Sequence, residues 1–241
     1  GKTVRFEYGK NSEKISLTYP DGEKVLFRYD KLGRLEEMID GKDVISYCYD
    51  QSGRLAGRKI PGGMESLYTY CANGRLEELT HNAYGETEER FLYSYNAAGL
   101  KSVIRKERKG MPHEAGMFSY GYDDAGRIRT VSRNGNLLRE YGYDGIGNRS
   151  YLKEDGSMTE YQYNVMNQLI CKTVTNQSGE RINYGYKYDR RGNITEISRN
   201  GKRLFSYVFG EDKRLKEACN EIGDKARYQY DALGNRIAKE T

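Results

Sequence analysis

One short phrase of residue types recurs along the whole chain and restricts the folds that the chain can adopt. In its clearest form the phrase is Tyr-Cys-Tyr-Asp-Gln-Ser-Gly-Arg-Leu, at residues 47–55. Its second aromatic recurs at steps of 20 to 27 residues, and another aromatic stands two positions before it each time. A fixed period of this length indicates a repeat architecture. The recurring second aromatics are Tyr8, Tyr29, Tyr49, Tyr70, Tyr95, Tyr122, Tyr143, Tyr163, Tyr188, Phe209 and Tyr230.

Each phrase predicts the end of a β-strand, a tight turn and the start of the next strand. Residues two apart share a face of a strand, so the paired aromatics lie on one side. Aspartate at the first turn position accepts backbone N–H groups of the turn, and glycine at the fourth takes the left-handed conformation before a bulge. The structural repeat residues predicted in this way are Tyr29, Asp30, Gly33, Tyr49, Asp50, Gly53, Tyr122, Asp123, Gly126, Tyr143, Asp144, Gly147, Tyr188, Asp189, Gly192, Tyr230, Asp231 and Gly234.

Some copies depart from this pattern. Asn96 and Asn164 replace the aspartate, and asparagine keeps the same turn chemistry. The turn after Phe209 lacks both the aspartate and the glycine at their usual positions, and we expect a looser turn there.

A second turn lies between successive phrases. Pairs such as Asn134-Gly135 and Asn200-Gly201 are typical of two-residue β-hairpin turns. Each copy therefore contains two turns and two strands, each of roughly 6–8 residues. Three copies are lengthened at this second turn, at residues 81–86, 109–116 and 173–178. Insertions confined to one edge of a repeat array indicate either a binding side or neutral drift.

The composition argues against a conventional hydrophobic core. Only 37% of the residues are hydrophobic and tryptophan is absent, yet the chain has 23 tyrosines and 28 glycines, most of them in the repeat. Aromatic pairs on neighbouring strands stabilise a sheet by about 0.2–1 kcal/mol each. The sequence therefore predicts an all-β fold, in which tandem β-hairpins form a coiled antiparallel sheet. We expect residues 1–241 to form a single array of about eleven copies, without separate domains.

The charged residues and cysteines favour no particular ligand. The net charge is +5, and the one basic run, Lys101–Lys109, is either a nucleic-acid patch or a lengthened solvated hairpin; we favour the hairpin. The four cysteines share no position within the repeat, so we expect free thiols rather than a disulfide framework.

No constellation of residues predicts catalysis, a cofactor or a metal ion. His81 and His113, the only histidines, are expected in inserted loops, without a second ligand at zinc spacing. The repeated aspartates could bind calcium or cap their turns. Capping is the interpretation that we favour, because each has turn N–H groups and a neighbouring arginine as partners. We therefore predict that the chain is not an enzyme.

The repeated phrase Tyr-x-Tyr-Asp-x-x-Gly-Arg-Leu resembles the YD repeat of the RHS-repeat family, over essentially the whole chain. This family includes bacterial Rhs toxins, wall-associated proteins and animal teneurins. The resemblance implies a β-hairpin ribbon that spirals into a hollow shell, which in bacterial members encloses or presents a C-terminal toxin. The family's Asp-Pro-x-Gly-like cleavage motif is missing, because Pro20, Pro61 and Pro112 follow other residues. No catalytic residue of the family is carried over.

The resemblance implies a structural shell segment of a longer protein, secreted or at a bacterial cell surface. The alternative is a cell-surface module that binds a glycan or a protein. The expected partners are the remaining repeats of the parent chain and an enclosed C-terminal domain, with a glycan or surface protein under the alternative. Unpaired strand edges also predict self-association. We expect no cofactor, no specific nucleic acid and no membrane span.

Overall fold

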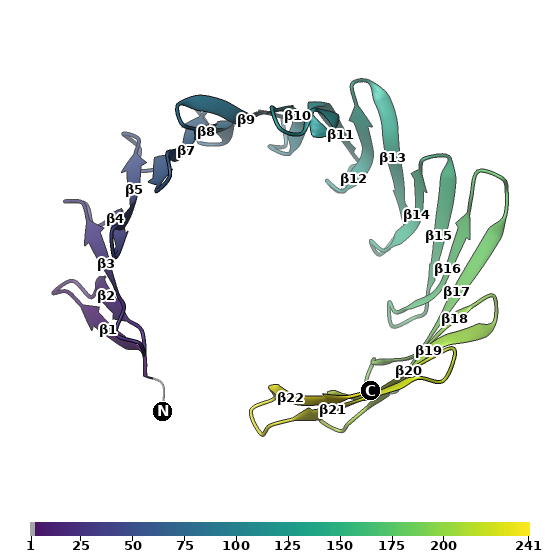
Figure 1. The fold of residues 1–241 in the computed structure, drawn as a ribbon. Helices are drawn as coiled ribbons and strands as arrows, with labels where there is room; N and C mark the ends of the chain where they lie inside the picture. Colours follow the sequence, from purple (N-terminus) through teal and green to yellow (C-terminus); the bar gives the residue numbers. More distant parts are fainter. Residues whose placement is uncertain (1–2) are drawn as a thin grey trace. The chain divides into compact units, whose positions relative to one another are not determined.

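The computed structural model describes residues 3–241, which are almost entirely β-strands and tight turns (Figure 1). The one helical element in this range is the 3₁₀ turn η1 (Pro112–Glu114). The chain divides into two compact units. Unit 1 comprises the chain up to residue 120 together with residues 133–135, and unit 2 comprises residues 121–132 and 136–241.

Each unit is built from antiparallel pairs of strands that follow one another in the chain. Pairing runs without interruption from β1 to β11 and from β13 to β22. The strands of unit 1 are β1 (Arg5–Tyr8), β2 (Lys14–Thr18), β3 (Lys24–Tyr29), β4 (Leu35–Asp40), β5 (Asp43–Tyr49), β6 (Leu55–Ile60), β7 (Met64–Tyr70), β8 (Leu76–Ala83), β9 (Glu86–Tyr95), β10 (Lys101–Arg108) and the first part of β11 (Gly116–Tyr122). Unit 2 contains most of β12 (Ile128–Arg133), then β13 (Asn136–Tyr143), β14 (Arg149–Glu154), β15 (Ser157–Tyr163), β16 (Leu169–Thr175), β17 (Arg181–Tyr188), β18 (Ile194–Arg199), β19 (Lys202–Phe209), β20 (Leu215–Asn220), β21 (Lys225–Tyr230) and β22 (Arg236–Glu240).

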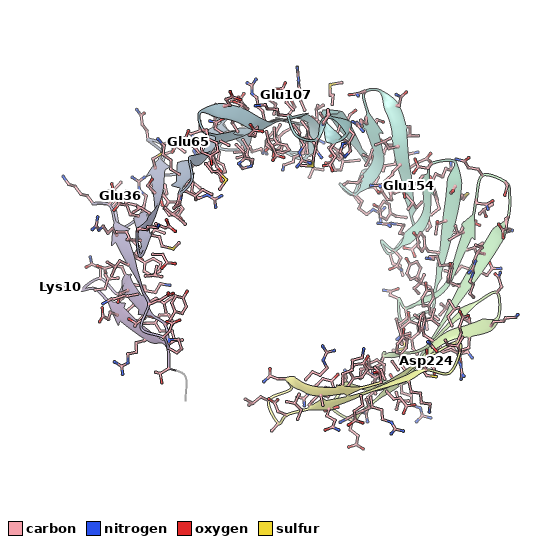
Figure 2. All side chains as sticks on the ribbon, in the orientation of Figure 1. Lys10, Glu36, Glu65, Glu107, Glu154 and Asp224 are labelled. Carbon is pink, nitrogen blue, oxygen red and sulfur yellow. The ribbon has the colours of Figure 1, made fainter. Side chains whose placement is uncertain are left out.

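Within each unit the strands form a single layer, and side chains project from both of its faces (Figure 2). Of the hydrophobic side chains in residues 3–241, Val25 alone is buried, with 4% of its surface exposed. A layered domain would bury a continuous hydrophobic face against a second layer. The predicted all-β antiparallel fold is therefore confirmed, and its stability comes from contacts within the sheet.

The tyrosine–aspartate turns have the predicted type I geometry with a bulge. In the β3–β4 hairpin the Asp30 N–H donates to the Arg34 carbonyl at 2.9 Å, and the Gly33 N–H donates to the Asp30 carbonyl at 3.0 Å. Gly33 has a φ of 75°. The strand register shifts between Arg28 and Tyr29, as the bulge requires. The bulge thus adds one residue to one side of the hairpin, and the turn reverses the direction of the chain.

The expectation of a looser turn after Phe209 is wrong. The Gly210 N–H donates to the Arg214 carbonyl at 2.9 Å, and the Lys213 N–H donates to the Gly210 carbonyl at 3.1 Å. Lys213 occupies the left-handed position with a φ of 59°. The backbone pattern therefore survives the loss of glycine, at a strain of about 1–2 kcal/mol for a residue with a side chain.

Substitution of Gly33 by valine tests the left-handed position. An added Cβ at Gly33 meets no atom within 4 Å, so the cost of Gly33→Val is backbone strain alone, about 1–3 kcal/mol. We expect a melting temperature lower by roughly 2–12 °C, measured by differential scanning calorimetry.

Gly145→Val is the matched control. Gly145 also lies in a turn with open space around it, but its φ is not in the left-handed region. Equal melting temperatures of the two variants would contradict the turn assignment.

Candidate functional site

The tyrosine–aspartate turns contain a contact that joins one copy of the repeat to the next. Asp30 Oδ1 accepts the N–H groups of Leu32 and Arg34, each at 2.9 Å, and its Oδ2 accepts from Arg34 Nε at 2.7 Å. The Arg34 guanidinium lies 4.4 Å from the ring centroid of Tyr49 in the following copy. The Tyr49 hydroxyl donates to the Leu35 carbonyl at 2.8 Å. Aspartate thus orients an arginine, and the arginine covers the next tyrosine.

This contact recurs in both units. Arg54 lies 4.5 Å from the Tyr70 ring, and Arg127 lies 4.5 Å from the Tyr143 ring. Arg214 lies over Tyr230 at the longer distance of 5.8 Å. The hydroxyl bonds to the carbonyl of a preceding strand are made by Tyr29 to Lys14, Tyr70 to Leu55, Tyr95 to Leu76, Tyr143 to Ile128 and Tyr188 to Leu169.

Asparagine takes the place of the arginine in three turns. The side-chain amides of Asn148, Asn193 and Asn235 donate to Oδ2 of Asp144, Asp189 and Asp231 at 3.0, 2.8 and 3.0 Å. Asp50 and Asp123 keep their arginines, Arg54 and Arg127, each with Nε at 2.7 Å. The predicted turn glycines all have positive φ: Gly33 75°, Gly53 80°, Gly126 76°, Gly147 99°, Gly192 85° and Gly234 94°.

These bonds lower the pKa of the turn aspartates. The backbone N–H of Arg34 is the main cause of the lowered pKa of Asp30. The side-chain amide of Asn193 is the main cause at Asp189. At Asp50, burial acts to raise the pKa, but the backbone and side-chain bonds from Arg54 outweigh it and the pKa is lowered. A carboxylate that accepts several N–H groups is held in its charged form.

The lowered pKa values predict acid sensitivity. A group whose pKa is lower in the folded state contributes stability above its unfolded pKa of about 3.9, and this stability is lost as the pH falls through the folded pKa. We expect a constant melting temperature above about pH 5 and a decline from about pH 4 downward.

The triple variant D30N/D50N/D123N isolates the contribution of these groups. It should melt lower at pH 7, because the ion pairs are lost, and its melting temperature should depend less on pH between about 5 and 2. An unchanged pH slope would contradict the role of these carboxylates.

The arginine–tyrosine contact can be measured by a double-mutant cycle. Arg34→Met and Tyr49→Leu should show a coupling of about 0.5–1 kcal/mol in denaturant unfolding, since the pair is partly exposed. Arg28→Met combined with Tyr49→Leu is the control, because Arg28 pairs with Glu37 instead. Equal coupling in the two cycles would refute the contact.

Sequence reasoning expected a neighbouring arginine for each aspartate, which is right for Asp30, Asp50 and Asp123 and wrong for the three turns with asparagine. It missed the tyrosine beneath the arginine. It also placed His81 in an inserted loop, whereas the structure places it in β8. The lengthened segment at residues 81–86 extends a hairpin rather than forming a loop, and its two-residue turn is Tyr84-Gly85. His113 lies in η1, as a lengthened segment allows.

His81 is bonded to a serine across the β7–β8 pair. Ser66 Oγ lies 3.0 Å from His81 Nδ1, and Ser66 is 5% exposed. Glu89 lies opposite His81 in the register, but its carboxylate accepts from Arg108 Nε at 2.7 Å. A hydrolytic triad needs a carboxylate bonded to the histidine and donors for an oxyanion. Ser66 and His81 therefore form two members of such a triad, but the Glu89 carboxylate is bonded to Arg108 and not to the histidine.

Several charged residues of the basic run, Lys101–Lys109, form local ion pairs. Lys109 and Arg108 of the basic run pair with Glu86 and Glu89, and Arg105 pairs with Glu107. Within residues 3–241 no group of three or more metal-binding side chains gathers. The four cysteines are free thiols, as predicted. The same range contains no helix of the length and apolarity that a bilayer crossing requires.

Comparison with known proteins agrees with the repeat. The family model described as Teneurin YD-shell matches residues 36–205. The chain is 27% identical over 234 residues to the tRNA3(Ser)-specific nuclease WapA of Bacillus spizizenii, covering 93% of this chain and 9% of WapA. It is 27% identical over 251 residues to toxin protein Tse5 of Pseudomonas aeruginosa, covering 92% of this chain and 18% of Tse5.

Among solved structures, the crystal structure of TcdB2-TccC3 is similar in fold. The TM-score is 0.63 at 13% identity, over 98% of this chain and 16% of the solved one. The chain thus spans only about a tenth to a fifth of the proteins that it resembles.

Proposed function

Because the chain belongs to the Teneurin YD-shell family, we propose that it is a segment of a shell wall that encloses or presents a C-terminal toxin or effector domain of a longer protein. The observation that carries the proposal is the single-layered sheet. Its copies bind one another, and Val25 is the one buried hydrophobic side chain in residues 3–241. A sheet stabilised in this way separates two spaces without needing a core of its own.

The segment itself is proposed to have no enzymatic activity. The recurring residues serve turns and contacts between copies, and the nuclease and toxin names of the relatives belong to proteins that the chain matches over a small part of their length. Activity in such a protein would then lie outside the repeats.

We further propose that residues 1–241 are one repeat array. The Tyr-x-Tyr-Asp phrase continues through residues 120–123, where the two compact units meet in the sequence, without a break in the pattern. The relatives support a secreted or surface location, which we propose for the parent protein. Edge-to-edge association through β1 and β22 is proposed for the isolated chain, because strand edges pair readily.

The alternative, a module that binds a glycan or a surface protein, has less support. Sugar stacking needs an accessible aromatic face, and many repeat tyrosines are covered by a cation, as Arg54 covers Tyr70. Three tyrosines are exposed: Tyr84, at the turn between β8 and β9, with 84% of its surface, Tyr8 with 60% and Tyr19 with 42%. Three exposed rings that share no position in the repeat are a weaker argument than a contact that recurs along the chain.

Limited proteolysis of the full parent protein tests the shell function. We expect its C-terminal domain to resist an added protease while the array is intact. A variant in which Gly33, Gly53 and Gly126 are all changed to valine should expose that domain, because the turns are strained.

The single variant Tyr84→Ala serves as the control, since the exposed ring supports no turn. A parent protein whose C-terminal domain is digested equally with an intact and a strained array would overturn the proposal. So would a parent protein with no further domain.

A further inference from the structure

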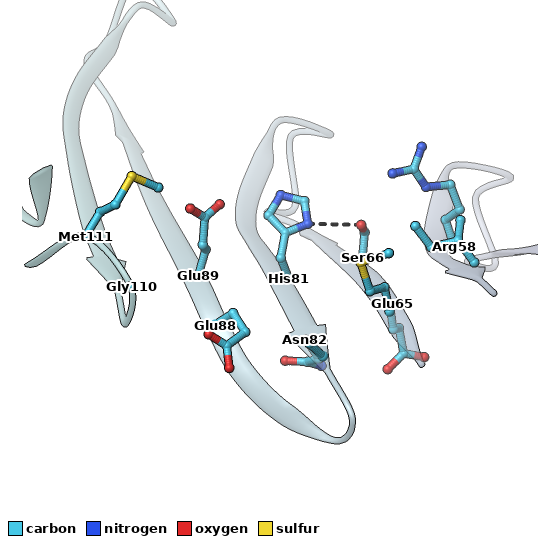
Figure 3. A pocket seen from close by; sticks show the side chains of 12 residues that line it. Arg58, Glu65, Ser66, His81, Asn82, Glu88, Glu89, Gly110 and Met111 are labelled. Atoms are coloured by element: carbon cyan, nitrogen blue, oxygen red, sulfur yellow. Dashed lines mark hydrogen bonds between the residues drawn. The ribbon is translucent and has the colours of Figure 1, made fainter. Parts of the chain in front are cut away.

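A pocket of about 410 Å³ opens on the sheet of unit 1 and is not explained by the repeat (Figure 3). The strand register places its polar side chains in one row across the strands. Arg58 lies opposite Ser66, Ser66 opposite His81, and His81 opposite Glu89. Hydrocarbon surface beside this row comes from Ile60, Met64, Ala83 and Met111. The pocket is therefore apolar along one side and polar along a line of neighbouring strands.

The carboxylates around the pocket are already neutralised. Glu65 pairs with Lys59 at 3.3 Å, and Glu88 pairs with Lys109 at 3.2 Å. Glu89 accepts from Arg108 at 2.7 Å. The anionic members of the lining thus each have a cation of their own.

Arg58 has no such partner. The Nε atom of Arg58 is completely buried, and this atom makes no hydrogen bond to any described residue. Leaving a buried donor unsatisfied costs about 1–3 kcal/mol, and more when the group is charged. Figure 3 shows the Arg58 side chain beside Ser66, at one end of the row. The pocket therefore holds one uncompensated positive charge next to a hydroxyl group.

We propose that this pocket binds a carboxylate that carries a short apolar group. The planar guanidinium of Arg58 matches a carboxylate through its two terminal Nη groups, as a bidentate pair. When His81 donates its Nδ1–H to Ser66, the serine hydroxyl hydrogen is free for the same carboxylate. Ile60 and Met64 then contact the apolar group of the ligand.

The size and charge of the pocket select this chemistry. A single arginine balances the charge of a monoanion, whereas one negative charge of a phosphate dianion would be left without a cation. A carboxylate of this kind could come from a free small acid or from the C-terminal residue of a peptide.

Nuclear magnetic resonance titration of the whole chain tests the proposal with three probes. These are 4-methylpentanoate, its neutral amide 4-methylpentanamide, and N-acetyl-L-leucinate as a peptide C-terminus. We expect both acids to shift the backbone amide signals of Ser66 and His81, and the neutral amide to bind at least about tenfold more weakly. Tighter binding of N-acetyl-L-leucinate would identify a peptide end as the ligand, and tighter binding of 4-methylpentanoate a free acid.

Arg58→Gln should weaken binding of the acids at least about tenfold without lowering the melting temperature, since the guanidinium has no partner to lose. Arg28→Gln is the control with the same change of charge, and it should bind normally. If Arg58→Gln failed to fold, Arg58→Lys would replace it. We expect Arg58→Lys to weaken binding, because lysine lacks the planar pair of N–H donors of a guanidinium. Equal affinity for acid and amide, unchanged affinity in both Arg58 variants, or no signal shift up to about 10 mM would overturn the proposal.

Discussion

The stacking of an arginine from one turn on the tyrosine of the next copy is the interaction on which the rest of the structure depends. In the Arg34–Tyr49 pair it combines a cation–π contact of about 0.5–1 kcal/mol with a hydroxyl bond of about 0.5–1.5 kcal/mol. Neither term is large, but the stacking recurs at Tyr70, Tyr95, Tyr143 and Tyr230. The hydroxyl bond recurs at Tyr29, Tyr70, Tyr95, Tyr143 and Tyr188. A single layer that buries almost no hydrophobic side chain must be held by such repeated contacts between neighbours.

A lengthened hairpin changes what the same sheet can do. The extra residues between Leu79 and Phe91 extend β8 and β9 beyond the length of their neighbours. In this hairpin His81 lies opposite Ser66 and Glu89 lies opposite His81, and the proposed carboxylate pocket lies beside this row. The regular copies supply the support, and departures from the repeat supply individual sites. The proposed wall and the proposed pocket are therefore compatible in one chain.

The sequence was sufficient for features that depend on a few adjacent residues. Asp30 and Gly33 define their turn locally, so the turn and the hairpin could be predicted from residue types. The Arg34–Tyr49 contact joins residues fifteen apart, and it could be known only from the strand register. His81 was misplaced because an insertion at a turn can extend a hairpin or form a loop with the same residues. Lys213 shows that backbone pairing can maintain a turn without the residue that favours it.

The dependence of each copy on its neighbours alone has a genetic consequence. Loss or duplication of one complete copy, about 20 residues with two strands, would leave every remaining arginine with a tyrosine to cover. Loss of half a copy would remove one strand and reverse the direction of every strand after it. Unequal recombination between similar repeats can therefore change the number of complete copies, and with it the length of the sheet, while the fold stays the same.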